Sequence, residues 1–175
     1  MLRGFILCSS LGALLAAVPA WADDPCLGFK WDVRQEHALF AGDAAPIAAG
    51  NSVQSAPQLR VGRLYALTLS RQSDVAFAAA PGRSLPADGS YAGLAALQFE
   101  DAGNYRIALD LGAWIDVAAD GKLAPVVDFQ GQRICDSPHK IVEFELRGAE
   151  HYVLQVSGAG TRVLHVTLTK APPRT

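Results

Sequence analysis

The sequence predicts an all-β fold, an antiparallel two-layer β-sandwich of jelly-roll type, on three observations. No window of about 11 residues sustains the apolar spacing i, i+3, i+4, i+7 of an amphipathic helix. Short runs of alternating apolar and polar residues recur between clusters of Gly, Pro, Asp and Asn, which is typical of antiparallel strands. Roughly nine to eleven such runs in one domain favour two packed sheets over a closed barrel.

The first 22 residues have the pattern of a cleavable secretory signal peptide. Arg3 supplies a positive start, residues 5–18 are uncharged and apolar, and residues 20–22 (Ala-Trp-Ala) place small side chains where a signal peptidase reads. The apolar run is about 14 residues long, whereas a membrane-spanning helix needs about 20. Cys8 follows bulky residues inside this run, which argues against a lipoprotein. We therefore expect a periplasmic or secreted protein without stable membrane insertion.

The remaining chain is expected to fold as one domain over residues 23–170, followed by a short Pro-containing tail at residues 171–175. The full sequence has 15 Lys and Arg against 17 Asp and Glu, a net charge of −2. This balance gives no electrostatic reason to expect nucleic acid or an anionic membrane as a partner.

Removal of the signal peptide would leave two cysteines, Cys26 and Cys135. In an oxidising compartment an isolated pair most simply forms one disulfide. Such a bond would close a loop of about 110 residues and stabilise the fold by up to about 4–5 kcal/mol on the chain-entropy model. It would tie the new N-terminus to the body of the domain. The alternatives, two free thiols or a metal pair, lack further Cys or a close His pattern.

The first element of the domain can be interpreted in two ways. Residues 29–40 begin with alternating apolar side chains, which predicts a strand. Asp32 followed by Gln35 would instead cap a short helix. We favour the strand.

Three later segments are variations on one unit. Each begins with Gly, places a Tyr two to four residues later, and then alternates apolar residues in phase with that Tyr. Each is followed, after a turn, by a second alternating run, so each unit predicts a hairpin. The first and second runs are 62–69 with 75–77, 103–109 with 115–117, and 148–156 with 164–168.

The pairing register of the second unit follows from its alternation, because opposed residues share a face of the sheet. Ile107 opposite Ile115 leaves residues 110–112 as a three-residue loop. Two further strands are predicted at residues 123–129 and 141–146, with a turn at residues 130–132.

The repeated Gly-x-Tyr, alternating strand and hairpin resemble the small β-sandwich modules attached to exported bacterial proteins, of the prepeptidase C-terminal type. The resemblance covers residues 95–119 and 143–169. It implies a non-catalytic accessory module, and it transfers no functional residues to this chain.

Residues 136–139 (Asp-Ser-Pro-His) contain the three residue types of a serine-hydrolase triad. Triad members normally come from separate segments, because they must surround a reacting carbonyl group. The chain also lacks the Gly-x-Ser-x-Gly elbow. We therefore interpret this segment as a turn after Cys135.

The four histidines, at positions 37, 139, 151 and 165, show no metal-binding spacing. In the predicted last hairpin, His151 and His165 share an outer face but lie about 13 Å apart, too far for one ion. Carboxylates show no glycosidase-like arrangement. The sequence predicts no metal and no cofactor.

The most suggestive constellation is Arg106, Trp114 and Asp116. The predicted hairpin places Arg106 opposite Asp116, and Ala108 opposite Trp114, on one face. An aromatic ring beside a cross-strand ion pair would form a platform for a sugar ring, a peptide or a partner's sheet. Alternatively, a neighbouring loop covers Trp114 and the ion pair only fixes the register of the sheet.

Together these features predict an exported, non-enzymatic binding or interaction module of the bacterial cell envelope. Its expected partner is an envelope protein or glycan of unknown identity. Two alternatives stay open. One is a small periplasmic hydrolase whose site is not visible in the sequence, and the other is a structural accessory factor for an envelope complex.

Overall fold

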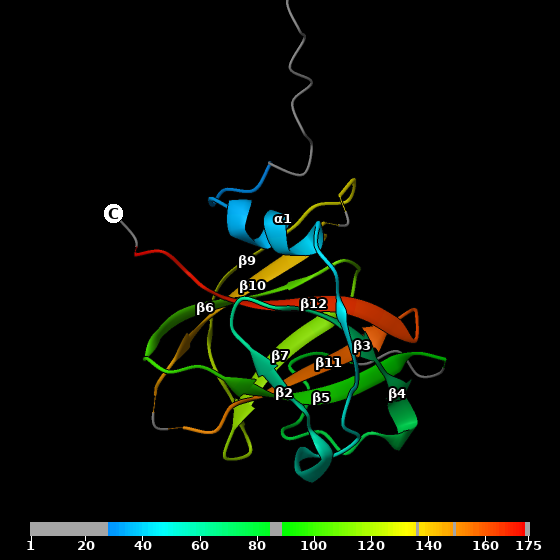
Figure 1. Ribbon diagram of the computed structural model, residues 1–175. Coiled ribbons are helices and arrows are strands. Elements are labelled where there is room, and N and C mark those ends of the chain that lie inside the picture. Colours follow the sequence, from blue (N-terminus) through cyan, green and yellow to red (C-terminus); the bar gives the residue numbers. More distant parts are fainter. Residues whose placement is uncertain (1–27, 85–88, 136, 149, 174–175) are drawn as a thin grey trace, which may run out of the picture.

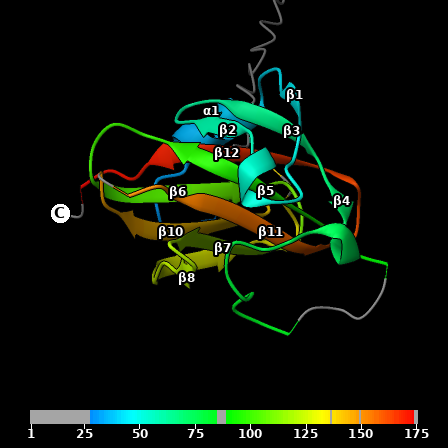
Figure 2. The same cartoon turned by 90° about the horizontal axis from the view of Figure 1, so that it is seen from below.

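Two β-sheets pack face to face into a β-sandwich, with one short helix against the outer face of one sheet (Figures 1 and 2). The computed structural model describes residues 28–84, 89–135, 137–148 and 150–173. The predicted signal peptide, Cys26 and Asp136 lie outside the described residues.

The two sheets are called sheet A and sheet B. Sheet A contains, in spatial order, β1 (Ala45–Ala48), β3 (Leu64–Thr68), β12 (Val163–Lys170), β6 (Gly103–Leu109), β10 (Lys140–Leu146) and β9 (Val126–Gly131). Sheet B contains β2 (Gln58–Arg60), β5 (Tyr91–Gln98), β11 (Val153–Ala159), β7 (Trp114–Ala119) and β8 (Lys122–Leu123), and β4 (Ser70–Arg71) pairs with β5. The helices are α1 (Arg34–Phe40) and the 3-10 turns η2 (Val53–Ser55) and η3 (Gln72–Asp74).

The main core lies between the sheets and consists of every second residue of the long strands. Ile107 and Leu109 of β6, for example, face Leu154 and Val156 of β11 within one buried cluster. Each fully buried Leu, Ile or Val side chain stabilises the fold by about 1.5–3 kcal/mol relative to an exposed one. The period-two alternation seen in the sequence is therefore the pattern of this core.

The sheets are mixed, so the prediction of a purely antiparallel sandwich is wrong in two places. β1 pairs with β3 in parallel, and β2 pairs with β5 in parallel. Between β1 and β3 the chain crosses to sheet B and forms β2, which lets it return to sheet A in its original direction. Parallel neighbours require such a crossover, because a tight turn joins only antiparallel strands.

The predicted hairpins are wrong, although most of their strands exist. β6 and β7 lie in different sheets, as do β11 and β12, and residues 75–77 form no strand. In a sandwich the inner faces of both sheets line the same core, so two consecutive strands alternate in phase whether they pair or face each other. Alternation alone does not tell these arrangements apart.

Other predicted elements fare differently. The strand expected at residues 141–146 is confirmed as β10, whereas the one at 123–129 breaks at residues 124–125 into β8 and β9. The strand favoured for residues 29–40 is wrong, since α1 occupies most of that segment. The carboxylate of Asp32, the residue before the N-cap Val33, accepts a hydrogen bond from the backbone N–H of Arg34, the first helical residue, at 3.1 Å.

The repeated Gly and Tyr residues have a common structural role. Each Tyr is buried near the start of a strand, and its hydroxyl group bonds to the backbone four or five residues earlier in the chain. The three bonds are Arg60 N to Tyr65 Oη at 3.1 Å, Tyr105 Oη to the carbonyl of Asp101 at 2.7 Å, and Arg147 N to Tyr152 Oη at 3.2 Å. The repeated Gly and Tyr pattern thus marks three chain connections that are each held by a hydrogen bond from or to a Tyr hydroxyl group. None of the described helices is long and apolar enough to cross a membrane.

Candidate functional site

Arg106 lies on the outer face of β6, beneath the segment that contains α1. Its Nε donates to Glu143 Oε2 at 3.1 Å, and its Nη1 donates to the backbone carbonyl of Asp32 at 2.9 Å. The ring of Trp31 lies over the guanidinium group at 5.0 Å. Only 4% of Arg106 is exposed. This arginine therefore fixes an internal contact, and almost none of its surface is open to a ligand.

Trp114 and Asp116 lie together on the outer face of β7. The indole Nε1 of Trp114 donates to Asp116 Oδ1 at 2.9 Å, and the backbone N–H of Gly82 donates to Asp116 Oδ2 at 3.0 Å. The structure thus unites two of the three predicted platform residues and places Arg106 on the opposite sheet. The predicted Arg106–Asp116 ion pair is wrong, because it depended on the β6–β7 hairpin.

A cleft of about 320 Å³ opens beside Trp114, and we call it the Trp114 cleft. It lies where the β6–β7 connection, the start of β10, the end of β11 and the loop after Gly82 meet. Its lining residues are Arg83, Gly112, Ala113, Trp114, Lys140, Ser157 and Gly158.

Two cationic groups converge on the indole ring in this cleft. Lys140 Nζ lies 4.9 Å and the guanidinium carbon of Arg83 lies 5.3 Å from the ring centre. Burial lowers the pKa of Lys140 below its ordinary value of 10.5, and the charge of Arg83 lowers it further, while Asp116 acts in the opposite direction. The described lining contains two cationic residues, Arg83 and Lys140, and no acidic residue, so the cleft presents an excess of positive charge.

Ser157 adds a hydroxyl group to the wall of the cleft. It pairs with Trp114 in the register of β11 and β7, and only 1% of its surface is exposed. Its Oγ has no hydrogen-bond partner among the residues that the structure describes. A buried hydroxyl group without a partner costs about 1–3 kcal/mol. Because this oxygen has almost no accessible surface, a ligand in the cleft could bond to it only if a neighbouring side chain moved.

His139 lies next to the cleft, in the predicted turn at residues 136–139. A Cβ built on Gly112 would lie 3.7 Å from His139 Nε2, and the other ring nitrogen, Nδ1, forms a hydrogen bond of 3.0 Å with the carbonyl of Cys135. Residues 137 and 138 form a turn, as expected.

The remaining histidines are dispersed. His165 Nδ1 lies 2.6 Å from Asp110 Oδ2, across the start of the β6–β7 connection. His151 precedes β11 of sheet B, so the shared outer face predicted for His151 and His165 does not exist. In the described part of the chain, no group of three or more His, Cys, Asp or Glu side chains could hold a metal ion.

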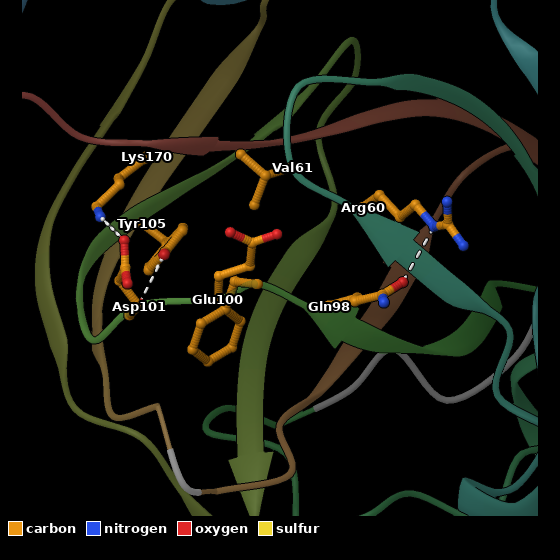
Figure 3. Close-up of a pocket in the computed structure, with 8 residues that line it drawn as sticks. Arg60, Val61, Gln98, Glu100, Asp101, Tyr105 and Lys170 are labelled. Carbon is orange, nitrogen blue, oxygen red and sulfur yellow. Dashed lines mark hydrogen bonds and ion pairs between the residues drawn. The ribbon is translucent and has the colours of Figure 1, made fainter.

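A second cavity of about 470 Å³ lies at another end of the sandwich, and we call it the β5-end cavity (Figure 3). It is lined by residues of β2, β5, β6 and β12 and of the connections that follow β2 and β5. These residues are Arg60, Val61, Gln98, Phe99, Glu100, Asp101, Tyr105 and Lys170. Burial raises the pKa of Tyr105 above its ordinary value.

Sequence reasoning identified Trp114 and Asp116 but missed Arg83, Lys140 and Ser157. These three residues come from a loop and from two strands of different sheets, so no local motif connects them. The only nearby feature of the sequence is Pro81-Gly82-Arg83, which predicts a loop that contains a cationic residue. In comparisons with known proteins, no protein-family model and no curated protein matches this chain.

Proposed function

We propose that this protein is an exported, non-enzymatic binding module of the cell envelope that holds an anionic group of an envelope glycan or protein in the Trp114 cleft. The observation that carries the proposal is the convergence of Arg83 and Lys140 on Trp114 in a cleft without acidic residues in its described lining.

The chemistry of these groups favours a carboxylate or a phosphate. A guanidinium group offers several N–H donors in one plane, and charge-assisted hydrogen bonds to oxyanions are about twice as strong as neutral ones. Lys140 is desolvated, and an anionic ligand would restore favourable electrostatics to its ammonium group. The Trp114 ring supports both cationic groups through its π face.

The hydrolase alternative has less support. A serine nucleophile needs a base within hydrogen-bond reach, but Lys140 Nζ donates to the carbonyl of Ala113 at 3.0 Å. Ser157 Oγ has no partner in the described residues. These contacts suit ligand binding better than activation of a nucleophile.

The disulfide and the periplasmic or secreted location belong to the same proposal. The side chains of Gln130 and Gln132 donate to the carbonyl of Gly28 at 3.1 and 2.5 Å, which holds the N-terminal segment beside β9. Cys26 precedes Gly28 by two residues, and the buried Cys135 follows Gln132 by three. Each cysteine is therefore within three residues, along the chain, of residues that are hydrogen-bonded to each other, which supports a Cys26–Cys135 bond in an oxidising compartment.

The jelly-roll type also stays a proposal. The connections from β5 to β6, from β6 to β7 and from β10 to β11 each pass from one sheet to the other, which supports a double-sheet jelly-roll arrangement.

The binding proposal can be tested with the mature protein, residues 23–175, by ¹H–¹⁵N NMR of the indole N–H groups. The spectrum of Trp114→Phe assigns the Trp114 signal. Glucuronate and glucose are matched probes, because they differ only in the carboxylate. Glucuronate is expected to shift the Trp114 signal, glucose is not, and added salt is expected to weaken the response.

Variants then locate the site. Arg83→Ala and Lys140→Gln are expected to weaken glucuronate binding at least fivefold, while Arg162→Ala, a change at another exposed arginine, leaves it unchanged. The proposal fails if neither glucuronate nor inorganic phosphate moves the Trp114 signal. It also fails if both cleft variants respond like the unmodified protein.

A further inference from the structure

We infer that the β5-end cavity is a second binding site, and that its ligand is an uncharged saccharide (Figure 3). The site shares no lining residue with the Trp114 cleft. Its volume of about 470 Å³ falls within the range of about 300–1,000 Å³ that is typical of small-molecule sites.

Two pairs of hydrogen-bonded polar side chains line the cavity. Arg60 Nε donates to Gln98 Oε1 at 3.0 Å, and Lys170 Nζ donates to Asp101 Oδ2 at 3.1 Å. These bonds orient the side chains and use only some of their capacity, since a guanidinium group has five N–H donors and an ammonium group has three. The carboxylate of Glu100 points toward Val61, into the space between the two pairs (Figure 3).

The charges in this cavity balance, and this decides the class of ligand. Arg60 and Lys170 are cationic, and Glu100 and Asp101 are anionic, so the lining has no excess of either sign. An ion of either charge would meet repulsion as well as attraction. A saccharide hydroxyl group both donates and accepts hydrogen bonds, so it matches a wall on which donors and acceptors lie side by side.

Apolar groups complete the match. Val61, Phe99 and the ring of Tyr105 contribute the apolar part of the lining. The Phe99 ring is held 4.8 Å from the Tyr105 ring and 5.9 Å from the Tyr152 ring, both tilted. A pyranose has apolar C–H groups on its ring faces, which pack favourably on aromatic carbon, whereas a small inorganic ion gains nothing from this surface.

The backbone at two of the polar residues, Arg60 and Asp101, is held in place before any ligand arrives. Tyr105 Oη donates to the backbone carbonyl of Asp101, and the backbone N–H of Arg60 donates to Tyr65 Oη. Fixing this backbone in advance reduces the entropy lost on binding, which favours even a small, weakly bound ligand.

The test uses ¹H–¹⁵N NMR of the mature protein titrated with chitotriose and maltotriose, two uncharged oligosaccharides. We expect at least one of them to shift the backbone signals of residues 98–101 in a saturable manner. Glu100→Ala and Arg60→Ala are each expected to weaken that binding at least fivefold. Both side chains are exposed, so the dispersed spectrum of each variant verifies its fold.

Matched controls use exposed residues of the same type outside the cavity. Glu145→Ala and Arg162→Ala are expected to bind like the unmodified protein, and the Trp114 indole signal is expected to stay in place throughout. The inference is overturned if neither oligosaccharide shifts residues 98–101, or if both cavity variants retain full binding. It is also overturned if glucuronate or phosphate shifts these residues while the uncharged sugars do not.

Discussion

Each outer face of the sandwich is partly covered by a chain segment, but the two covers are held by different chemistry. The segment of residues 28–40, with α1, lies over sheet A, and residues 75–84 lie over sheet B (Figures 1 and 2). Both covers bury apolar residues against the sheets. The cover on sheet A is fixed by buried charges. The cover on sheet B is fixed mainly by hydrogen bonds between its backbone and side chains of the sheet.

The cover on sheet A depends on an ionic network. Arg106 lies between Glu143, at 3.1 Å, and Glu36 of α1, at 3.9 Å. Thr169 Oγ1 donates to Glu36 Oε1 at 2.5 Å. All four side chains are buried, so each charge relies on the others for compensation.

The cover on sheet B is held by an amide side chain. Gln155 Oε1 accepts from the backbone N–H of Ala79 at 3.2 Å, and Gln155 Nε2 donates to the carbonyl of Ala79 at 3.1 Å. Asp116 accepts from the backbone N–H of Gly82, three residues further on. Neutral hydrogen bonds contribute about 0.5–1.5 kcal/mol each and those to charged groups about 1.5–3 kcal/mol, so opening this cover costs less than opening the cover on sheet A.

This difference has a functional consequence. The Trp114 cleft lies at the end of the more weakly fixed cover, and Arg83 belongs to that cover. Loops that carry binding residues generally belong to the parts of a fold with the lowest local stability. The comparison therefore predicts that damage to sheet A lowers global stability, whereas damage to the cover on sheet B acts locally and near the cleft.

The largest effect is expected for Arg106→Met. Removing the guanidinium group leaves Glu36 and Glu143 buried without their cationic partner, which costs about 3–5 kcal/mol in the free energy of unfolding. Urea denaturation of the mature protein measures this loss. Arg162→Ala serves as the control and should change stability by less than about 0.5 kcal/mol. A loss of less than about 1 kcal/mol for Arg106→Met would show that the network does not hold the cover.

A smaller, local effect is expected for Gln155→Leu. The substitution removes both hydrogen bonds to Ala79 and leaves two backbone groups without a partner, at a cost of about 1–3 kcal/mol. Amide exchange at Ala79 and Gly82 should accelerate, while exchange in α1 stays at its original rate. Equal acceleration in both covers would contradict the distinction between them.

The covers also show what the sequence predicted and what it did not. The inner faces were predictable, because each inward-facing strand residue contributes to a period-two pattern, and β6 and β10 lie where that pattern placed them. The outer faces were not, since Arg106, Glu143 and Gln155 occupy positions that alternation assigns to solvent. Their burial depends on segments far away in the sequence, and no local rule predicts that contact.

The candidate site was predicted only in part for the same reason. Trp114 and Asp116 are two positions apart on one strand and therefore share a face, which alternation does predict. Arg83 and Lys140 reach Trp114 from a cover loop and from the other sheet, so their approach depends on tertiary structure alone. The incorrect prediction of a hairpin had instead placed Arg106 beside Trp114 and Asp116.

The smallest effect on stability is expected for Lys140→Met. This variant is informative because its effect on stability can be compared with its effect on ligand binding. Because folding lowers the pKa of Lys140, the unfolded chain binds the proton more tightly, and this group's contribution to stability rises with pH up to about its ordinary value of 10.5. Met keeps the apolar stem and removes the desolvated charge. We therefore expect the free energy of unfolding at pH 7 to stay within about 1 kcal/mol of the unmodified protein, or to rise.

The same variant should lose most of the response of Trp114 to glucuronate. Unchanged stability with weakened binding would mean that Lys140 is retained for its charge, at some cost to the fold, as expected for a ligand-binding group. A clear loss of stability would instead assign Lys140 to the scaffold, through its bond to the carbonyl of Ala113. In that case Lys140 would be retained for the stability of the fold, and the contrast between the two covers would not extend to function.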